Sequence, residues 1–267
     1  MRNRSLLFVP GHRPERFDKA LASGADGVII DLEDAVAPPD KPAARDTVRI
    51  WLSSARPVIL RINSADTPWF DDDLALCGLP GVAAVMLPKA DSAATVARVM
   101  AAGAAAVLPL IESAAGLAAL AGIAGAAGVQ RLVFGAIDLQ VDLGLRDALE
   151  DELLPFRLQL VLASRLAGIG APIDGVSTAI DDAQTLQHDV QRARRLGFAG
   201  KLCIHPRQVA TVQHGFSPSA DEQAWARRVL DAAAAAGGAA VAVDGRMVDT
   251  PVLKRAETIL REASDAA

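Results

Sequence analysis

Short apolar segments recur along the chain at intervals of about 20 to 35 residues, and each is followed by a stretch whose apolar residues repeat with helical spacing. Repeated pairs of a strand and a helix are typical of folds built on parallel strands that helices cover. Eight segments have this pattern, and eight strands are the number that closes a (β/α)8 barrel. We expect strands at about Leu6 to Pro10, Gly27 to Leu32, Val58 to Ile62, Ala83 to Pro88, Ala105 to Ile111, Arg131 to Ile137, Ile173 to Ser177 and Lys201 to Ile204.

The segments between these strands carry signals for the start of a helix. Several of the starts are prolines or capping Ser and Asp residues, which favour the first turn. A doubly wound open sheet would show the same alternation, so periodicity by itself leaves two fold classes open. The expected helices begin near Pro14, Pro42, Pro68, Ser92, Ser113, Leu153, Asp181 and Pro206.

Charged residues at the ends of the expected strands separate these two classes. In a barrel the carboxyl ends of all strands converge on one mouth, whereas in an open sheet they spread along an edge. We therefore predict an α/β fold of the (β/α)8 TIM-barrel type with one polar mouth. The residues at or just past the strand ends are Asp31, Glu33, Asp34, Arg61, Lys89, Glu112, Asp138, Asp174 and His205.

The length of 267 residues fits one such barrel with a short C-terminal α/β extension. We expect the catalytic barrel to span residues 1–216 and the extension to span residues 217–267. The extension breaks the repeat, because it predicts a helix from about Asp221 to Ala236, a short strand over Ala239 to Val243, and a last helix after Pro251.

Composition excludes several classes of function. A net charge of -5 and a pI near 5.4 give no basic surface for nucleic acid. No apolar stretch reaches the roughly 18 uninterrupted residues of a membrane span, and the N-terminal segment lacks the apolar core of a signal peptide. We expect a cytoplasmic protein that acts on a small molecule. Cys77 and Cys203 are isolated, without metal or redox spacing.

Two carboxylates follow consecutive strands. Glu112 ends the segment from Leu108, and Asp138 ends the segment from Val133. Two hard oxygen ligands with waters are a common way to hold Mg²⁺, which leaves positions for substrate oxygens. The alternative is that each acid caps a helix start, where the helix dipole favours it.

Three acids lie within four residues at the end of the second strand, at Asp31, Glu33 and Asp34. Such a cluster is costly unless water, a metal or a cation offsets the repulsion. The acids could hydrogen-bond the waters of a metal ion, or they could form a salt bridge or cap a helix. Both readings stay open on the sequence alone.

Three basic residues also lie at or just past the ends of expected strands. Arg61 could clamp a carboxylate through two hydrogen bonds, or it could pair with the acids of the second strand. Lys89 could form a Schiff base, although we favour a salt bridge. His205 could act as a general base, while the proline after it simply starts a helix. Four unpaired histidines make a zinc site improbable.

Short motifs that occur in order over nearly the whole chain resemble the citrate lyase β-subunit-like branch of the HpcH/HpaI aldolase superfamily. The resemblance also extends to malyl- and citramalyl-coenzyme A lyases. Most of these motifs are weak singly, and together they are specific. They are Ser5-Leu6-Leu7-Phe8-Val9-Pro10-Gly11 with Arg13-Pro14, Asp31-Leu32-Glu33-Asp34-Ala35-Val36, Leu60-Arg61-Ile62-Asn63, Leu87-Pro88-Lys89, Ile111-Glu112-Ser113, Gly135-Ala136-Ile137-Asp138-Leu139, Ile173-Asp174-Gly175-Val176 and Gly200-Lys201-Leu202-Cys203-Ile204-His205-Pro206.

The resemblance implies Mg²⁺ on Glu112 and Asp138, with Arg61 holding the carboxylate of an oxoacid or a 3-hydroxyacyl group and Glu33 as a further catalytic residue. It implies a Mg-dependent lyase that cleaves a coenzyme A thioester such as citryl-, malyl- or citramalyl-coenzyme A into acetyl-coenzyme A and an oxoacid. The implied substrate and coenzyme A contacts are Arg61, Glu112, Phe8, Arg13, Lys19, Ile137, Ile204 and His205.

The C-terminal extension contains Gly245-Arg246-Met247-Val248-Asp249-Thr250-Pro251, which looks like a tail motif of the malyl- and citramalyl-coenzyme A lyases. In those enzymes an aspartate reaches into the site of a neighbouring subunit, so the resemblance implies a catalytic Asp249 and a homotrimer or hexamer. Without the resemblance, an Asp-Thr-Pro sequence indicates an ordinary helix start.

Three alternative functions stay open. The chain could be an acyl-coenzyme A thioesterase, or an aldolase that cleaves pyruvate-derived hydroxy acids without coenzyme A. From another class, it could be a carrier-dependent subunit that works only inside a citrate lyase complex. The tail that carries Asp249 favours a free-standing enzyme.

Overall fold

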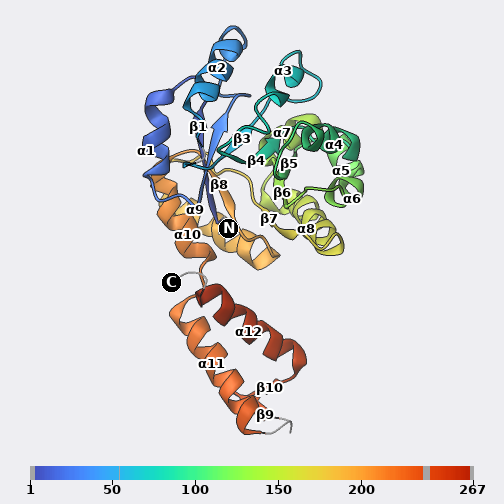
Figure 1. Cartoon of the computed structure of the whole chain (residues 1–267). Helices are drawn as coiled ribbons and strands as arrows, with labels where there is room; N and C mark the ends of the chain where they lie inside the picture. The colour runs from blue at the N-terminus through green and yellow to red at the C-terminus, as the bar shows by residue number, and fades with distance from the viewer. Residues whose placement is uncertain (1–3, 54, 237–240, 265–267) are drawn as a thin grey trace. The chain divides into compact units, whose positions relative to one another are not determined.

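A computed structural model of the chain describes residues 4–53, 55–236 and 241–264 (Figure 1). The chain divides into two compact units, one ending at Gln213 and the other beginning at His214. Each unit is described here by itself.

The first unit contains eight parallel strands that form a barrel, which confirms the predicted fold class (Figure 1). Their order in the sheet is β7-β6-β5-β4-β3-β2-β1-β8. A parallel bridge between Asp174 and Lys201 joins the two outer strands and closes the barrel. The strands are β1 (Ser5–Pro10), β2 (Gly27–Asp31), β3 (Val58–Arg61), β4 (Val82–Leu87), β5 (Val107–Ile111), β6 (Arg131–Phe134), β7 (Gly170–Ile173) and β8 (Lys201–Cys203).

Helices follow the strands in the order that the sequence predicts. They are η1 (Pro14–Arg16), α1 (Phe17–Leu21), η2 (Pro38–Asp40), α2 (Lys41–Trp51), α3 (Phe70–Leu74), α4 (Ala93–Ala101), α5 (Ala114–Ala118), α6 (Leu120–Ala124), α7 (Ala136–Asp142), α8 (Glu150–Leu166), α9 (Ala183–Leu196), η3 (Pro206–Gln208) and α10 (Val209–Phe216). Ser92 and Ser113 cap α4 and α5 through their side chains, as expected from the sequence.

The structure corrects two of the predicted strands. The sixth ends at Phe134 instead of Ile137, and residues 136–142 form helix α7, which the sequence reading missed. The apolar run continues through the turn, so hydrophobicity alone gives no stop signal there. The seventh was predicted from Ile173 to Ser177 but runs from Gly170 to Ile173. It thus begins three residues earlier than predicted, and Asp174 forms only the isolated bridge that closes the barrel.

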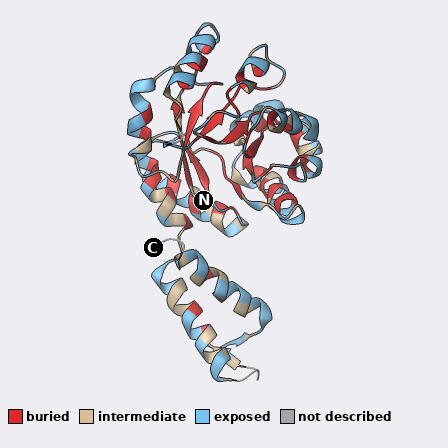
Figure 2. Ribbon diagram, viewed as in Figure 1, coloured by how far each residue is buried: buried red, intermediate tan, exposed pale blue. Residues whose placement is uncertain are grey.

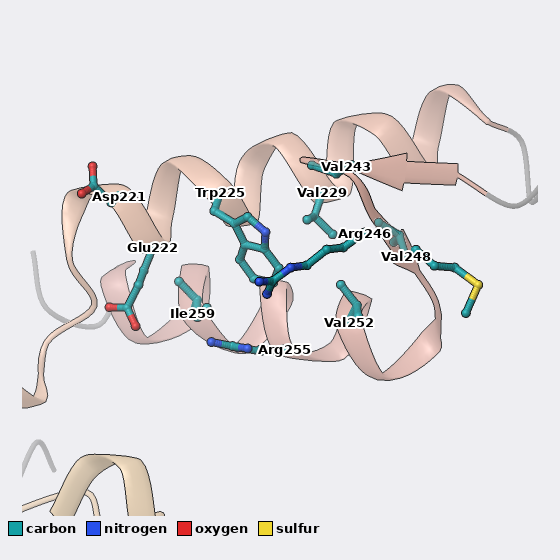
Figure 3. Close-up of a pocket in the computed structure, with 11 residues that line it drawn as sticks. Asp221, Glu222, Trp225, Val229, Val243, Arg246, Val248, Val252, Arg255 and Ile259 are labelled. Carbon is teal, nitrogen blue, oxygen red and sulfur yellow. The ribbon is translucent and has the colours of Figure 1, made fainter. Parts of the chain in front are cut away.

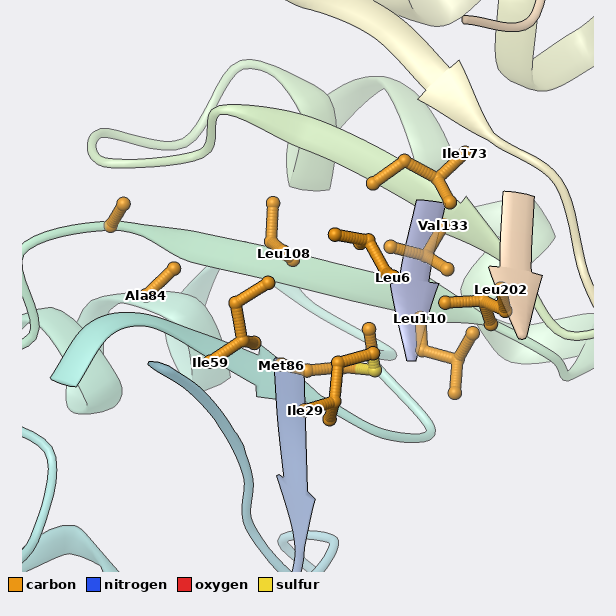
Figure 4. Packing of buried hydrophobic residues seen from close by; sticks show 11 residues of the cluster. Leu6, Ile29, Ile59, Ala84, Met86, Leu108, Leu110, Val133, Ile173 and Leu202 are labelled. Atoms are coloured by element: carbon orange, nitrogen blue, oxygen red, sulfur yellow. The ribbon is translucent and has the colours of Figure 1, made fainter. Parts of the chain in front are cut away.

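The barrel interior is packed with aliphatic side chains from all eight strands (Figure 4). One residue in two along each strand points inward, as the period of a strand requires. Figure 2 shows buried residues along the strands and exposed residues on the outer faces of the helices. The inward cluster includes Leu6, Ile29, Ile59, Met86, Leu108, Leu110, Val133, Ile173 and Leu202.

A buried ionic cluster lies where the barrel closes. Asp174 is fully buried, and its carboxylate accepts hydrogen bonds from Arg157 Nε at 3.0 Å and Lys201 Nζ at 3.2 Å. Burial by itself would raise the pKa of Asp174, but the charges of Lys201 and Arg157 outweigh that effect and lower it. The carboxylate is therefore a structural anion of the barrel seam.

The second unit is a helical hairpin with a small β-ribbon. It contains α11 (Ala220–Ala235), β9 (Val241–Val243), β10 (Arg246–Val248) and α12 (Thr250–Ser264). The strands are antiparallel, and β10 was absent from the sequence prediction. The helices meet through Ala226, Val229, Ala256 and Ile259. A groove of about 420 Å³ beside them holds Trp225 with Arg255 over its ring at 5.3 Å (Figure 3).

Within the described residues, no helix combines the length and the apolar character that crossing a membrane requires.

Candidate active site

A cavity of about 500 Å³ opens at the carboxyl ends of the barrel strands. Its walls include side chains from seven of the strands or the loops that follow them. Of the residues predicted to form the site, it brings together Phe8, Arg61, Glu112, Ile137, Asp138 and Ile204. Strand ends of a barrel converge in this way, and this position is where barrel enzymes place their active sites.

Arg61 ends β3 and is held by acids from the end of β2. Its Nε and Nη2 donate to the two carboxylate oxygens of Asp31, each at 2.6 Å, and its Nη1 lies 2.9 Å from Glu33 Oε2. Burial lowers the pKa of Arg61, but Asp31 and Glu33 more than compensate and raise it. The ion pair left open by the sequence is therefore present, and it fixes the orientation of the guanidinium toward the cavity.

The Phe8 ring covers the Arg61 guanidinium, with the Cζ atom 4.7 Å from the ring centroid. A guanidinium has five N–H donors, and Asp31 receives two of them. Arg61 therefore keeps donors that can reach an anionic group in the cavity.

Glu112 follows β5 and is buried, with 4% of its surface exposed. Its Oε1 accepts a hydrogen bond of 2.8 Å from the main-chain amide of Lys89. The pKa of Glu112 is raised to about 8, mainly by burial and in addition by the negative charges of Glu33 and Asp138. A buried carboxylate of this kind becomes an anion at neutral pH when a cation is bound beside it.

Asp138 lies in the first turn of α7 and not at the end of β6, as the sequence had suggested. It is exposed and lines the same cavity as Glu112. Gly135 is the N-cap of this helix, and a Cβ added there would lie 2.4 Å from Glu112 Cβ and 2.6 Å from Glu112 Oε2. The tight turn at Gly135 thus brings the two acids into one cavity.

The described residues contain no group of three or more His, Cys, Asp or Glu side chains arranged to hold a metal ion. Two carboxylates and open space suit Mg²⁺, which keeps several waters and commonly takes only one or two protein carboxylates. The buried Glu112 and the exposed Asp138 therefore fit a magnesium ion whose other ligands come from solvent or substrate.

Glu33 lies between Arg61 and Lys89. Its Oε2 is 2.9 Å from Arg61 Nη1 but has no partner in hydrogen-bond geometry, and Lys89 Nζ is 3.8 Å from its Oε1. Burial is the main reason why the pKa of Glu33 is raised to about 7. Glu33 lines a second, smaller hollow, and its neighbour Asp34 lines both this hollow and the main cavity.

Besides Glu33, four predicted site residues lie outside the cavity lining. Arg13 pairs with Glu15 at 2.6 Å, and Lys19 is exposed on α1. His205 caps η3, since its Nδ1 accepts from the Arg207 amide at 3.2 Å. Asp249 is in the second unit, where its Oδ1 accepts from the Val252 amide at 3.1 Å at the start of α12. Asp249 thus has the contact of an ordinary helix start, which the sequence left as an alternative, and His205 precedes a helix that starts at Pro206, as its following proline indicated.

The sequence analysis missed Gln208, which ties two loops of the mouth together. Its Oε1 accepts from the amides of Ile204 at 2.9 Å and His205 at 3.3 Å, and its Nε2 donates to the Ser177 carbonyl at 2.9 Å. It is buried, with 1% of its surface exposed. A glutamine three residues after a helix cap is a capping-box signal that could have identified it.

Lys41 was missed as well. Its Nζ donates to the carbonyls of Leu32 and Glu33 at 2.9 and 2.8 Å and to Asn63 Oδ1 at 2.6 Å. A buried lysine satisfied by two carbonyls and an amide oxygen holds the acidic loop after β2 in place.

A barrel with two acids and an arginine at its mouth can hold a metal ion beside a substrate carboxylate, which fits the class of metal-assisted lyases and aldolases. The family model of the HpcH/HpaI aldolase/citrate lyase family matches residues 4–206, and the chain belongs to this family.

Two curated relatives cover nearly the whole chain. A citrate lyase subunit beta-like protein of Deinococcus radiodurans is 39% identical over an alignment of 274 positions, which covers 96% of this chain and 96% of that protein. An L-malyl-CoA/beta-methylmalyl-CoA lyase of Cereibacter sphaeroides is 35% identical over 301 residues, covering 98% of this chain and 94% of the relative.

The solved structures include protein CitE from Mycobacterium tuberculosis in complex with magnesium, acetoacetate and coenzyme A. It is 41% identical to this chain, covers 98% of each chain and superposes with a TM-score of 0.86. The likeness covers both the fold and the sequence.

Proposed function

We propose that this protein is a magnesium-dependent carbon–carbon lyase that cleaves a 3-hydroxyacyl-coenzyme A into acetyl-coenzyme A and an oxoacid, reversibly. The observation that carries the proposal is the convergence of Arg61, Glu112 and Asp138 on one cavity at the barrel mouth. Relatives that are lyases of malyl-coenzyme A, and a structure of CitE with magnesium and coenzyme A, support it.

Glu112 and Asp138 are the residues that would hold the magnesium ion. Bound there, Mg²⁺ would act as a Lewis acid on the substrate oxygen where negative charge develops. Lys89 contributes through its main-chain amide, which fixes one oxygen of Glu112 at 2.8 Å. The remaining carboxylate oxygens of the pair stay available to a cation.

Arg61 would bind the carboxylate of the substrate next to the hydroxyl-bearing carbon. Asp31 prevents the guanidinium from turning away, so its orientation is set before the substrate binds. Glu33, buried beside Arg61, is the third acid that we assign to the reaction, as a group that orients water and Arg61 at the reacting end.

Cleavage breaks the bond between the hydroxyl-bearing carbon and the carbon next to the thioester. The hydroxyl group loses its proton and becomes the ketone of the oxoacid, and the thioester fragment takes up a proton on carbon. We assign the second transfer to Asp249 of a neighbouring subunit, which would make the active form a homotrimer or hexamer. The exposure of Asp249 supports this role.

The thioester would extend over the apolar part of the mouth, where Phe8, Ile137 and Ile204 lie. Arg13, Lys19 and His205 lie outside the cavity lining, so we assign them to the distant, anionic part of coenzyme A. Ile204 is 37% exposed and Ile137 is 48% exposed, which leaves both side chains free to contact a ligand.

One assay tests the proposal. The purified chain with Mg²⁺ is incubated with malyl-, citramalyl- and citryl-coenzyme A, and oxoacid and free thiol are measured separately. The lyase releases oxoacid and acetyl-coenzyme A in equal amounts. Free thiol without oxoacid would identify a thioesterase, and cleavage of free hydroxy-oxo acids alone would identify an aldolase. Activity that requires an added acyl-carrier protein would identify a subunit of a citrate lyase complex.

A further inference from the structure

Helix α7, which carries Asp138, has little packing against the rest of its unit. Of its seven residues only Leu139 is buried, while Ile137 is 48% exposed and Val141 is 78% exposed. Packing of a buried face is what normally stabilises and fixes a short helix in a protein. The position of Asp138 therefore depends on the contacts at the two ends of α7.

The first of these contacts lies at the start of the helix. The amide of Gly135, the N-cap residue, donates a hydrogen bond of 3.0 Å to the carbonyl of Ile111, which directly precedes Glu112. This bond fixes the turn between β6 and α7 against the end of β5. Because it acts at one end only, it restrains the direction of the helix weakly.

The second contact lies at the last residue of the helix. Asp142 Oδ2 accepts a hydrogen bond of 2.7 Å from the main-chain amide of Ala114, the first residue of α5 and the second after Glu112. The first amides of a helix have no partner within the helix, so a side chain from elsewhere can bind one of them. Asp142 thus ties the far end of α7 to the segment that carries Glu112.

Asp142 occupies a position that its own helix disfavours. The helix dipole opposes a carboxylate in the last turn, and two like charges four residues apart, Asp138 and Asp142, repel each other. Residues four apart lie on the same face of a helix, one turn from each other. The charge-assisted hydrogen bond with the Ala114 amide offsets this unfavourable placement.

We propose that Asp142 is a positioning residue for magnesium, which holds α7 against the adjoining segment so that Asp138 and Glu112 can bind the same ion. The inference rests on the magnesium site proposed above. Asp142 does not line the cavity and is not itself a ligand in this proposal. Mg²⁺ demands near-ideal octahedral geometry, so a small shift of one carboxylate weakens its binding.

Removal of the acceptor tests the proposal. Asp142→Ala breaks the hydrogen bond, and we expect the Kd for Mg²⁺ to rise roughly tenfold, as for other groups that orient metal ligands. The Kd is obtained from the melting temperature as a function of Mg²⁺ concentration. Each variant is compared with itself without metal, so a loss of stability alone leaves its Kd unchanged. The matched control Asp46→Ala removes an exposed aspartate from α2 and should keep the wild-type Kd.

Two further variants separate the hydrogen bond from the charge. Asp142→Asn keeps an acceptor for the Ala114 amide but loses the negative charge, so its Kd should lie closer to the wild type than to Asp142→Ala. Ala114→Pro keeps the charge and removes the donor. Proline is tolerated at the first position of a helix, and the extended backbone of Ser113, with φ of −143° and ψ of 159°, suits the residue before a proline.

Ala114→Pro should raise the Kd as much as Asp142→Ala does. The double variant Asp142→Ala/Ala114→Pro should bind Mg²⁺ no more weakly than either single variant, because both changes break the same hydrogen bond. Circular dichroism of every variant checks that the fold is retained.

The outcomes distinguish this inference from the metal site on which it rests. A wild-type melting temperature that does not respond to Mg²⁺ would overturn both. A normal wild-type response with an unchanged Kd in Asp142→Ala would overturn the inference alone, and a lower melting temperature without metal would then indicate a purely structural role. Equal Kd values for Asp142→Asn and Asp142→Ala, with a wild-type Kd for Ala114→Pro, would show that the charge of Asp142 acts on the ion and its hydrogen bond does not.

Discussion

The main-chain amide of Lys89 donates a hydrogen bond of 2.8 Å to Oε1 of Glu112, from a left-handed backbone conformation with φ of 46°. The side chain of Lys89 points elsewhere, toward Glu33, at 3.8 Å. Lys89 therefore positions a proposed metal ligand through its backbone, which any residue able to adopt this conformation could do.

Replacing Lys89 with glycine should leave most of the activity. Glycine adopts positive φ without strain, so the hydrogen bond to Glu112 is retained. The loss of a half-exposed ion pair with Glu33 is worth at most about 1 kcal/mol, or roughly fivefold in kcat/KM. Steady-state kinetics test this expectation. Complete loss of activity, with borohydride trapping of an oxoacid on the wild-type protein, would instead indicate a Schiff base on Lys89.

Glu112→Gln and Asp138→Asn should each remove the response to magnesium. An ion that binds the folded state and not the unfolded one stabilises the protein, and the effect grows with the ratio of its concentration to Kd, so Mg²⁺ should raise the melting temperature of the wild-type protein. We expect neither variant to show this rise at millimolar Mg²⁺, and both to lose lyase activity. Asp34→Asn is the matched control, because Asp34 lines the same cavity and is not assigned to the metal. A normal magnesium response in Glu112→Gln would remove Glu112 from the metal site.

Asp174→Asn should destabilise the barrel strongly near neutral pH. The change leaves Arg157 and Lys201 buried with less countercharge, which costs about 3–5 kcal/mol for a broken buried ion pair. The pKa of Asp174 is lowered in the folded state, so its contribution is present above the usual aspartate range and is lost as pH falls through the folded value. Denaturant unfolding at pH 7 and pH 3 should therefore show a smaller difference between variant and wild type at the lower pH. An equal difference at both values would contradict this assignment.

Gln208→Ala should loosen the mouth while leaving the acids in place. It removes the acceptor for the Ile204 amide and the donor to the Ser177 carbonyl, at about 1–3 kcal/mol of stability for unsatisfied buried groups. Because Ile204 lines the cavity, we expect KM for the thioester to rise several-fold with a smaller change in kcat. Gln208→Glu keeps the acceptor and loses the donor, so its KM should lie in between. A loss of stability together with a lower kcat and an unchanged KM would indicate a purely structural role.

The sequence predicts the barrel and much of the cavity lining because both follow from strand ends. Glu112 and Arg61 each end or follow a short buried strand, and the carboxyl ends of barrel strands must meet at the mouth. Phe8 and Ile204 were assigned through the family resemblance, and both line the cavity.

Contacts between distant parts of the chain were not predictable in the same way. Whether Arg61 binds Asp31 or a ligand depends on side-chain orientations that the spacing of residues does not encode. Asp138 was predicted at a strand end but lies in the first turn of a helix that follows Gly135. The sequence did not show this, because an uninterrupted apolar run does not mark where a strand stops. The hydrogen bond from the Arg207 amide to the His205 side chain was not anticipated, because the sequence indicated only a helix start at Pro206.

The backbone at Gly135 has φ of −101°, a value that residues with side chains adopt freely. Glycine is required there for another reason, because even a methyl group would overlap the carboxylate of Glu112. Exchange of this glycine for alanine would therefore force the backbones at Gly135 and Glu112 apart, because rotation of the Glu112 side chain cannot move its Cβ atom. The missing Cβ atom of Gly135 thus leaves the space that the side chain of Glu112 occupies.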